Sequence, residues 1–287
     1  QAIMFVADNR LSSAKAYFNE QLTTQFSASE CKQMWQQILY KRFRWTPTEL
    51  LLKQDERLSE SDLLYIRSFV KRLQTHEPFQ HILGEVFFSD LVLKSDARAL
   101  VPRPETEELI DLIQKQSQDF SQIVDLCTGS GCIALALKSK FPQAELLGLD
   151  LSQEAIALAT ENASFTNLDV DFQVIDIFEW QPTQNFDLLV SNPPYIPQAE
   201  KAQMQANVLQ YEPHMALFVP DQAPLLFYER LQVLAKNHLT KGGWLALEIH
   251  EDFATSTKAL FETPDFINLE IYRDLQGKNR MLLAQKA

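Results

Sequence analysis

The stretch of sequence that decides the fold is residues 123–150, IVDLCTGSGCIALALKSKFPQAELLGLD. Its apolar start predicts a strand that ends in a glycine-rich turn, followed by a helix over 133–140 and a second strand over 145–150. Glycines at such a turn let the backbone pass close to a ligand, and the free amides of the helix start favour a negatively charged group. Asp150 ends the second strand, where an acidic side chain in a doubly wound sheet accepts hydrogen bonds from ribose hydroxyls. The stretch therefore indicates an α/β fold that binds a nucleoside-containing cofactor.

The glycine motif does not fit two common nucleotide-binding patterns. It lacks the GxGxxG spacing of dinucleotide-binding folds, and no GK[ST] follows as in a phosphate loop. Taken alone, the turn could also be only a tight strand-to-helix connection. Asp150, 19 residues beyond Gly131, is what favours a cofactor site.

Strand-like and helical segments continue to alternate after residue 150, which predicts a largely parallel sheet covered by helices on both faces. The expected strands are 123–127, 145–150, 170–175, 186–190, 244–249, 267–272 and 280–284, and the expected helices are 105–115, 133–140, 153–163, 225–238 and 253–261. Only residues 273–279 join the last two strands. Because that link is too short for a helical crossover, the final pair must be antiparallel.

The residues before this region predict a separate helical domain. Residues 1–78 contain no glycine and carry apolar residues at helical spacing. Thr46, Pro47 and Glu49 mark one helix start, and the run 59–62 marks the next. Residues 79–101 change to short β-like runs at 81–88 and 91–93, which predict a hairpin linker. We therefore expect a helical domain over 1–78, a hairpin over 79–101 and an α/β domain over 102–287.

Composition and charge limit the class of protein. The chain has 287 residues, which suggests about two domains. Its 46% hydrophobic and 22% charged residues fit a folded protein and exclude a mostly disordered one. A net charge of −12 disfavours stable, non-specific nucleic-acid binding. The three cysteines have no metal-ligand spacing, and no apolar run approaches membrane-spanning length, so we expect a cytoplasmic protein with no metal and no membrane contact.

A second motif lies at the end of the strand 186–190, where Asn192, Pro193, Pro194 and Tyr195 follow Ser191. Two consecutive prolines remove two backbone donors and leave fixed carbonyl acceptors. This rigid loop stands at the carboxyl end of a strand, where open α/β sheets bind ligands. Asn192 adds a side-chain oxygen and Tyr195 adds an aromatic face.

Such a loop suits a planar NH2 group. An amide or aromatic-ring NH2 donates two hydrogen bonds but is a poor nucleophile because its lone pair is delocalised. The Asn192 side-chain oxygen and the Pro193 carbonyl could hold both hydrogens and aim the nitrogen at an electrophile, which can contribute up to about 7–11 kcal/mol. The Tyr195 ring could orient the substrate group and attract a cationic sulfonium methyl. No general base is needed, since the methylated nitrogen loses its proton to solvent.

These motifs resemble a known family. DLCTGSGCIALAL over 125–137, Asp150 and SNPPYI over 191–196 are similar to class I S-adenosylmethionine-dependent methyltransferases, in which NPPY is the amino-methylating motif. VPRPETE over 101–107, YEP over 211–213 and DLQGKNR over 274–280 look like the release-factor glutamine methyltransferases, the PrmC/HemK family. The resemblance implies a Rossmann-like, seven-stranded methyltransferase domain with an antiparallel last strand, preceded by a helical domain and a hairpin.

The resemblance also implies the roles of individual residues. The substrate would be the glutamine of the Gly-Gly-Gln loop of class-1 peptide chain release factors, which act in translation termination, and the cofactor S-adenosyl-L-methionine. Asn192, Pro193, Pro194 and Tyr195 would hold that glutamine, with Asn192, Pro193 and Tyr195 in the catalytic role, and the helical domain and hairpin would dock the rest of the partner. The cofactor would be bound by Cys127, Thr128, Gly129, Ser130, Gly131, Asp150, Asp176, Ile177 and Asn192.

The chain departs from the family pattern at two positions. Cys127 stands where the family usually has glycine, and we expect it to be tolerated because Gly129 and Gly131 are kept. His250 follows Glu248 and Ile249 where glycine is more usual, and we expect a solvated or packed histidine rather than a catalytic one. Cys127 and Cys132 flank the loop without histidine partners, which disfavours a metal or redox site.

Two other functions remain possible from the sequence. An adenine amino-methyltransferase would present the same NH2 group to the same loop, but it calls for a basic groove to hold a polyanion. A catalytically idle binding protein would retain the fold, but it has no physical reason to keep Asn192 and Asp150.

Overall fold

The computed structural model describes residues 5–116 and 118–287. It divides into two compact units, one up to Leu83 and one from Gly84 onward. Residues 1–4, which belong to the predicted helical region, lie outside the described residues. Among the described residues, no helix is long and apolar enough to cross a membrane.

The first unit is helical, as predicted. Its helices are α1 (Leu11–Leu22), α2 (Ala28–Phe43), α3 (Pro47–Leu52), α4 (Glu60–Gln74) and α5 (Phe79–Leu83). The two predicted helix starts are confirmed: the side chains of Thr46 and Ser59 each accept a hydrogen bond from the backbone three residues ahead, and the acidic side chain there bonds back to the cap backbone. A core that includes Phe18, Trp35 and Ile66 holds the helices together.

The prediction of a strand beginning at residue 81 was wrong. Residues Phe79–Leu83 form α5, and the first strand of the hairpin begins only at Glu85. Proline at 78 favours a helix start, and its carbonyl accepts hydrogen bonds from the amides of His81 and Ile82. Gly84 then ends the helix with φ +74°. Ile82 and Leu83 are buried in the helical core, so tertiary packing overrides their β-like composition.

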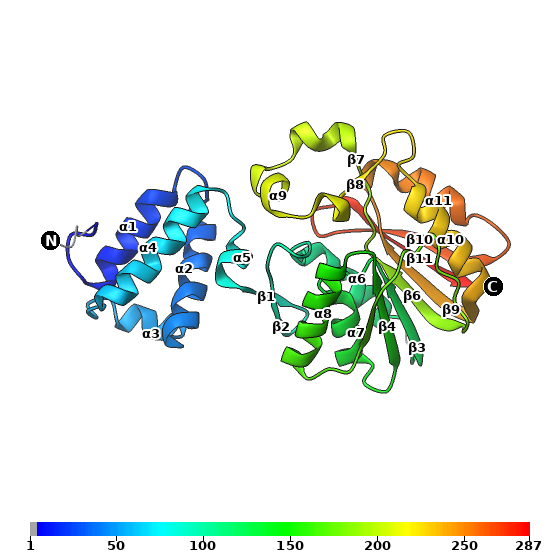
Figure 1. Cartoon of the computed structure of the whole chain (residues 1–287), viewed down its shortest axis with the longest axis horizontal. Coiled ribbons are helices and arrows are strands. Elements are labelled where there is room, and N and C mark those ends of the chain that lie inside the picture. The colour runs from blue at the N-terminus through cyan, green and yellow to red at the C-terminus, as the bar shows by residue number, and fades with distance from the viewer. Residues whose placement is uncertain (1–4, 117) are drawn as a thin grey trace. The chain divides into compact units, whose positions relative to one another are not determined.

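The second unit opens with the predicted hairpin and continues as an alternating α/β series (Figure 1). Its principal elements are β1 (Glu85–Phe88), β2 (Leu91–Lys94), α6 (Pro104–Gln114), β3 (Gln122–Leu126), α7 (Cys132–Lys140), β4 (Glu145–Asp150), α8 (Gln153–Thr166), β5 (Asp171–Val174), β6 (Phe186–Ser191), α10 (Leu226–His238), β9 (Leu239–Glu248), α11 (Ala254–Phe261), β10 (Phe266–Arg273) and β11 (Asn279–Lys286).

In the part of the chain that the structure describes, seven of these strands form one sheet in the order β10-β11-β9-β6-β3-β4-β5. Pairs among β9, β6, β3, β4 and β5 are parallel, whereas β11 runs antiparallel to both of its neighbours. The seven-stranded sheet and its antiparallel last strand are therefore confirmed. Strand order reverses direction between β3 and β6, the point at which open α/β sheets bind ligands.

Helices cover both faces of this sheet, so its strands are apolar on both sides. Leu188 and Val190 of β6 pack with α6 and α7, while Leu189 between them packs with α10 and α11. In Figure 1, α6, α7 and α8 lie on one side of the sheet and α10 and α11 on the other. A buried central sheet fixes the positions of the loops at its carboxyl edge.

The segment between β6 and α10 was not predicted. It contains β7 (Ile196–Pro197), η1 (Gln198–Gln203), α9 (Ala206–Tyr211), η2 (His214–Ala216) and β8 (Phe218–Val219). The pair β7 and β8 is parallel, and the Ile196 amide donates to the Leu217 carbonyl at 3.0 Å. The end of this segment therefore lies beside the loop that follows β6.

Candidate active site

The glycine-rich turn after β3 is shaped by left-handed backbone. Cys127, Gly129 and Gly131 have φ values of +60°, +56° and +79°. The Thr128 amide donates to the Leu149 carbonyl at 2.9 Å, and the Gly131 amide donates to the Thr128 carbonyl at the same distance. Gly131 is the N-cap residue of α7. The turn thus leads from β3 directly into a helix start, and Cys127 adopts the left-handed conformation that usually favours glycine.

Two acidic residues, Asp125 and Asp150, accept hydrogen bonds from this turn. The hydroxyl of Thr128 donates to Asp125 Oδ2 at 2.5 Å, and Asp125 is fully buried. Burial raises the pKa of Asp125 to about 7, because the hydrogen bond from Thr128 offsets only part of the desolvation. Asp150 accepts from the amides of Gly129 and Ser152, each at 2.9 Å, and burial raises its pKa also. These bonds fix the carboxylates of both strand ends.

A cavity opens at this edge of the sheet. It brings together Cys127, Thr128, Gly129, Ser130, Asp150, Asp176, Ile177 and Asn192 of the predicted cofactor site, and Pro194 of the predicted substrate loop. Gly131, Pro193 and Tyr195 are not among its lining residues. Further walls come from the segment after the hairpin, through Arg98, Ala99 and Leu100, and from Met215 and Phe227.

The Asn192–Tyr195 loop follows β6 as predicted. The Ser191 hydroxyl donates to the Leu126 carbonyl at 2.6 Å, which ties the end of β6 to the end of β3. The Tyr195 hydroxyl donates to Glu248 Oε1 at 2.9 Å, and the Thr106 hydroxyl donates to Glu248 Oε2 at 2.6 Å. Burial raises the pKa of Tyr195, so its hydroxyl stays protonated and remains a donor. Glu248 therefore anchors the end of the loop to α6.

A second buried glutamate joins two walls of the cavity. Glu212 accepts from the amide of Val101 at 3.0 Å and from Nη2 of Arg103 at 2.6 Å. Val101 and Arg103 line the cavity, as does Pro213, the residue after Glu212. The contact explains the position of the YEP run in the fold. It fixes the chain segment before α6 against the segment after α9.

His250 is a packed side chain, as predicted. It is buried, its Nδ1 accepts from the Asp252 amide at 3.1 Å, and its Nε2 lies 3.2 Å from Glu200 Oε2. Glu200, His250 and Asp252 could place ligand atoms within 4.8 Å of one another. Both ring nitrogens already have these partners, so hydrogen bonding accounts for the arrangement.

Cys127 and Cys132 remain thiols at neutral pH. Burial raises the pKa of Cys127, and it raises that of Cys132 to about 12. A thiol is a poor metal ligand and a poor nucleophile compared with a thiolate. The absence of a metal or redox site at this loop stays a prediction.

Sequence reasoning assigned no role to Glu212, Glu248, Thr106 or Asn162. Asn162 did leave a signal: it is a polar residue on the buried stripe of α8 that otherwise holds alanine, leucine and isoleucine. Glu248 gave a weaker sequence signal, because it is an acidic residue at the end of an apolar strand. Asn162 and Glu248 contact residues that are distant in the chain. The hydrophobic periodicity of a sequence gives no information about such contacts.

Comparisons with known proteins show which family the chain resembles. Residues 104–214 match the family described as Methyltransferase small domain, and residues 14–84 match the PrmC N-terminal domain. A protein of Bacteroides thetaiotaomicron named release factor glutamine methyltransferase is 35% identical over 273 residues, covering 94% of this chain and 98% of that protein. One of the same name from Flavobacterium psychrophilum is 36% identical, covering 93% and 96%. A methyltransferase structure from Pyrococcus furiosus has a TM-score of 0.49 at 18% identity, covering 68% of this chain and 87% of that one.

Proposed function

This chain belongs to the family of release factor glutamine methyltransferases, and from that premise we propose that it methylates the glutamine of the Gly-Gly-Gln loop of class-1 peptide chain release factors. The methyl group of S-adenosylmethionine would pass to the side-chain amide nitrogen of that glutamine. The observation that carries the proposal is the loop Asn192–Tyr195 at the edge of a cavity that also holds Gly129 and Asp150.

The residues of the cavity fit S-adenosylmethionine. A β-carbon added at Gly129 would meet nothing within 4 Å, so the turn leaves room for a ligand. Asp150 is a half-buried carboxylate that lines the cavity, and ribose hydroxyls are suitable donors to it. Asp176 and Ile177, after β5, also line the cavity, which supports their proposed contact with the adenine. When bound, the cofactor supplies an electrophilic methyl carbon on a sulfonium.

The chain's own residues position the amide. The Asn192 side-chain oxygen and the Pro193 carbonyl accept the two amide hydrogens, which orients the nitrogen lone pair. The Tyr195 hydroxyl donates to Glu248, which fixes the end of the loop, and the proposed task of the Tyr195 ring is to orient the substrate amide. The nitrogen loses one proton to water, so no side chain has to act as a base.

The helical region is proposed to dock the remainder of the release factor. The expected division into a helical domain over 1–78, a hairpin over 79–101 and a catalytic domain over 102–287 stays a proposal, with the helical domain extended to Leu83 because Phe79–Leu83 form α5. The net charge of −12 supports a protein partner over a nucleic acid. The three cysteines are unpaired, which supports a reducing compartment such as the cytoplasm.

The test is mass spectrometry of class-1 release factors after incubation with the chain and isotope-labelled S-adenosylmethionine. We expect one added methyl group, located on the glutamine of the Gly-Gly-Gln loop. Methylation of free nucleic acid, with none on release factors, would show an adenine amino-methyltransferase instead. Absence of both cofactor binding and methyl transfer would show a binding protein without activity.

A further inference from the structure

Asn162 is a fully buried polar side chain in the middle of α8. Its neighbours on the same stripe, Ala155, Leu158 and Ala159, are the small or apolar residues that a helix packed on a sheet requires. Asparagine is a poor helix former, and burying its amide costs free energy unless each polar atom is hydrogen-bonded. The hydrogen bonds that stabilise the Asn162 side chain must therefore come from residues outside α8.

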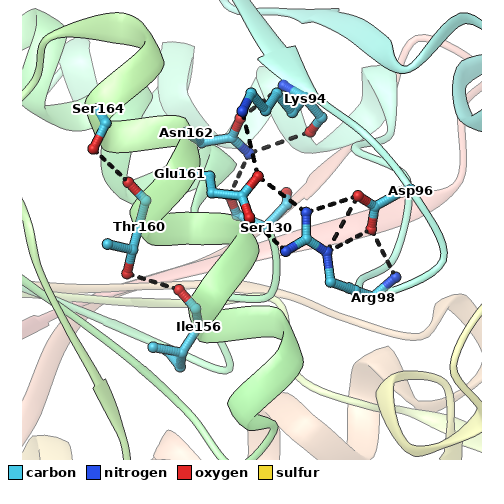
Figure 2. Close-up of polar contacts among 9 residues, drawn as sticks. All are labelled: Lys94, Asp96, Arg98, Ser130, Ile156, Thr160, Glu161, Asn162 and Ser164. Atoms are coloured by element: carbon cyan, nitrogen blue, oxygen red, sulfur yellow. Dashed lines mark hydrogen bonds and ion pairs between the residues drawn. The ribbon is translucent and has the colours of Figure 1, made fainter.

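Those contacts join the hairpin to the cofactor loop. Asn162 Oδ1 accepts from the Lys94 amide at 2.7 Å, and Nδ2 donates to the Lys94 carbonyl at 3.2 Å. The same Nδ2 donates to the Ser130 carbonyl at 3.0 Å (Figure 2). One side chain thus pairs with both backbone groups of Lys94, as a neighbouring strand would, and with the turn between β3 and α7.

A group of ion pairs surrounds this contact. Glu161 accepts from two nitrogens of Arg98 at 2.7 and 3.1 Å, and Arg98 also pairs with Asp96 (Figure 2). Arg98 lines the cavity, whereas Asn162 is not among its lining residues. The segment 94–98 is therefore held against α8 at its end by Glu161 and at its start by Asn162.

We infer that Asn162 is a positioning residue for the cofactor: it fixes the Ser130 carbonyl and the end of the hairpin relative to α8, and thereby sets the affinity for S-adenosylmethionine. The inference rests on the proposed placement of the cofactor in the cavity. Ser130 lines that cavity and lies between Gly129 and Gly131, two glycines in left-handed conformation. Because glycines constrain a turn weakly, a bond to the residue between them has a large influence on its position.

The test is Asn162→Asp, which has nearly the same shape. The Oδ1 acceptor for the Lys94 amide is kept, but the Nδ2 donor becomes an oxygen that faces two carbonyls. We expect the affinity for S-adenosylhomocysteine, measured by titration calorimetry, to fall by about tenfold or more, because both hydrogen bonds donated by Nδ2 are lost. At saturating cofactor, turnover should stay near that of the unchanged chain, so the effect appears in KM for the cofactor and not in kcat.

Two control variants lie on the same helix. Ser164→Ala removes a bond from the Ser164 hydroxyl to the Thr160 carbonyl, and Thr160→Val removes one from the Thr160 hydroxyl to the Ile156 carbonyl (Figure 2). Neither touches the hairpin or the cofactor loop. Both should leave the affinity for S-adenosylhomocysteine unchanged, even where they lower the melting temperature. An equal loss of affinity in the controls would show a general effect of helix stability and overturn the inference.

Hydrogen exchange on the unchanged chain gives a measurement that does not depend on folding of a variant. Saturating S-adenosylhomocysteine should slow exchange of the Lys94 amide more than that of the Ala246 amide in β9, which reports general stabilisation of the unit. Equal slowing of exchange at the two amides would overturn this inference and leave the proposed function unaffected. The same would follow from an Asn162→Asp variant that folds and binds S-adenosylhomocysteine as tightly as the unchanged chain. Failure of the unchanged chain to bind S-adenosylhomocysteine would overturn the proposed function together with it.

Discussion

At the scale of single residues, Asn192 and Asp150 line the same cavity, and the proposed function gives them separate tasks. Asp150 accepts from two backbone amides and lines the cavity. Asn192 begins the proline loop after β6, so its side-chain oxygen is the group proposed to bind the reacting amide. Substitutions should therefore separate cofactor binding from turnover.

We expect Asn192→Ala to lower kcat by about 100-fold, the scale on which loss of precise positioning acts. Affinity for S-adenosylhomocysteine should change little, because the lost acceptor serves the reacting nitrogen. Steady-state kinetics with a release factor and titration calorimetry measure the two quantities. Asn237→Ala, at an exposed position of α10, is the control. An unchanged kcat in Asn192→Ala would contradict the assigned role.

Asp125 predicts how the stability of the fold depends on pH. Burial raises its pKa in the folded chain to about 7, above the unfolded value near 3.8. Between these values the folded state binds more protons than the unfolded state, so this group's contribution is present below pH 4 and is lost as pH rises through 7. Each pKa unit corresponds to about 1.4 kcal/mol, so the loss can reach on the order of 4 kcal/mol.

The variant Asp125→Asn should remove this dependence. Its free energy of unfolding should exceed that of the unchanged chain at pH 8, and the difference should shrink as the pH falls and vanish near pH 4. Denaturant titrations across this range provide the measurement, with Asp169→Asn, at an exposed position, as the control. If the difference between Asp125→Asn and the unchanged chain did not vary with pH, Asp125 would not be the titrating group.

At the scale of elements, the sequence predicted what periodicity and capping determine. The strands of the large sheet and the helix starts at Thr46 and Ser59 are present. The helix Phe79–Leu83 was missed because its identity depends on Pro78, Gly84 and burial in the helical core. The segment between β6 and α10 was missed because its elements are only two to six residues long, too short for a period to be visible.

The residues of the candidate site also fall into two groups, those that the sequence could predict and those that it could not. Residues on the loops of the parallel strands could be placed from the sequence, because carboxyl ends of such strands share one edge. Glu212 and Glu248 could not, because each bonds to residues that are 53 to 142 positions away in the chain. Buried polar contacts of this kind follow from tertiary packing and leave no local pattern.

The turn between β3 and α7 should respond differently at its two glycines. A β-carbon at Gly131 would lie 2.7 Å from Phe172 Cζ, whereas one at Gly129 would meet nothing within 4 Å. We expect Gly131→Ala to cost more than the roughly 1–2 kcal/mol of left-handed strain, because packing must shift as well. Gly129→Ala should cost only that strain but should weaken cofactor binding, since the added methyl points into the cavity.

Thermal unfolding and titration with S-adenosylhomocysteine together distinguish these two effects. Each variant serves as the control for the other, because both introduce the same methyl group at a positive φ. Equal stability losses in the two variants would show that the contact with Phe172 is not what limits the residue at 131.

At the scale of the whole molecule, the two units have separate hydrophobic cores. The core of the helical unit is formed by residues 6–83, and the cores of the catalytic unit by residues from Val86 onward. The hairpin belongs to the second set, since Val86, Phe88 and Leu93 pack with α6 and α7. Lys94 at its end is bonded to Asn162. A chain that begins at Gly84 therefore keeps every residue that lines the cavity.

We expect this shortened chain to bind S-adenosylhomocysteine as the full chain does. Its KM for an intact release factor should rise by about tenfold or more, because losing a docking surface worth about 1.4 kcal/mol has that effect. A short peptide that contains the Gly-Gly-Gln sequence has nothing to dock on the helical unit, so both chains should methylate it at the same rate. Steady-state kinetics with the two substrates give the comparison. An unchanged KM for the intact release factor would mean that the helical unit does not dock it, whereas loss of cofactor binding would mean that the catalytic unit needs the helices to fold.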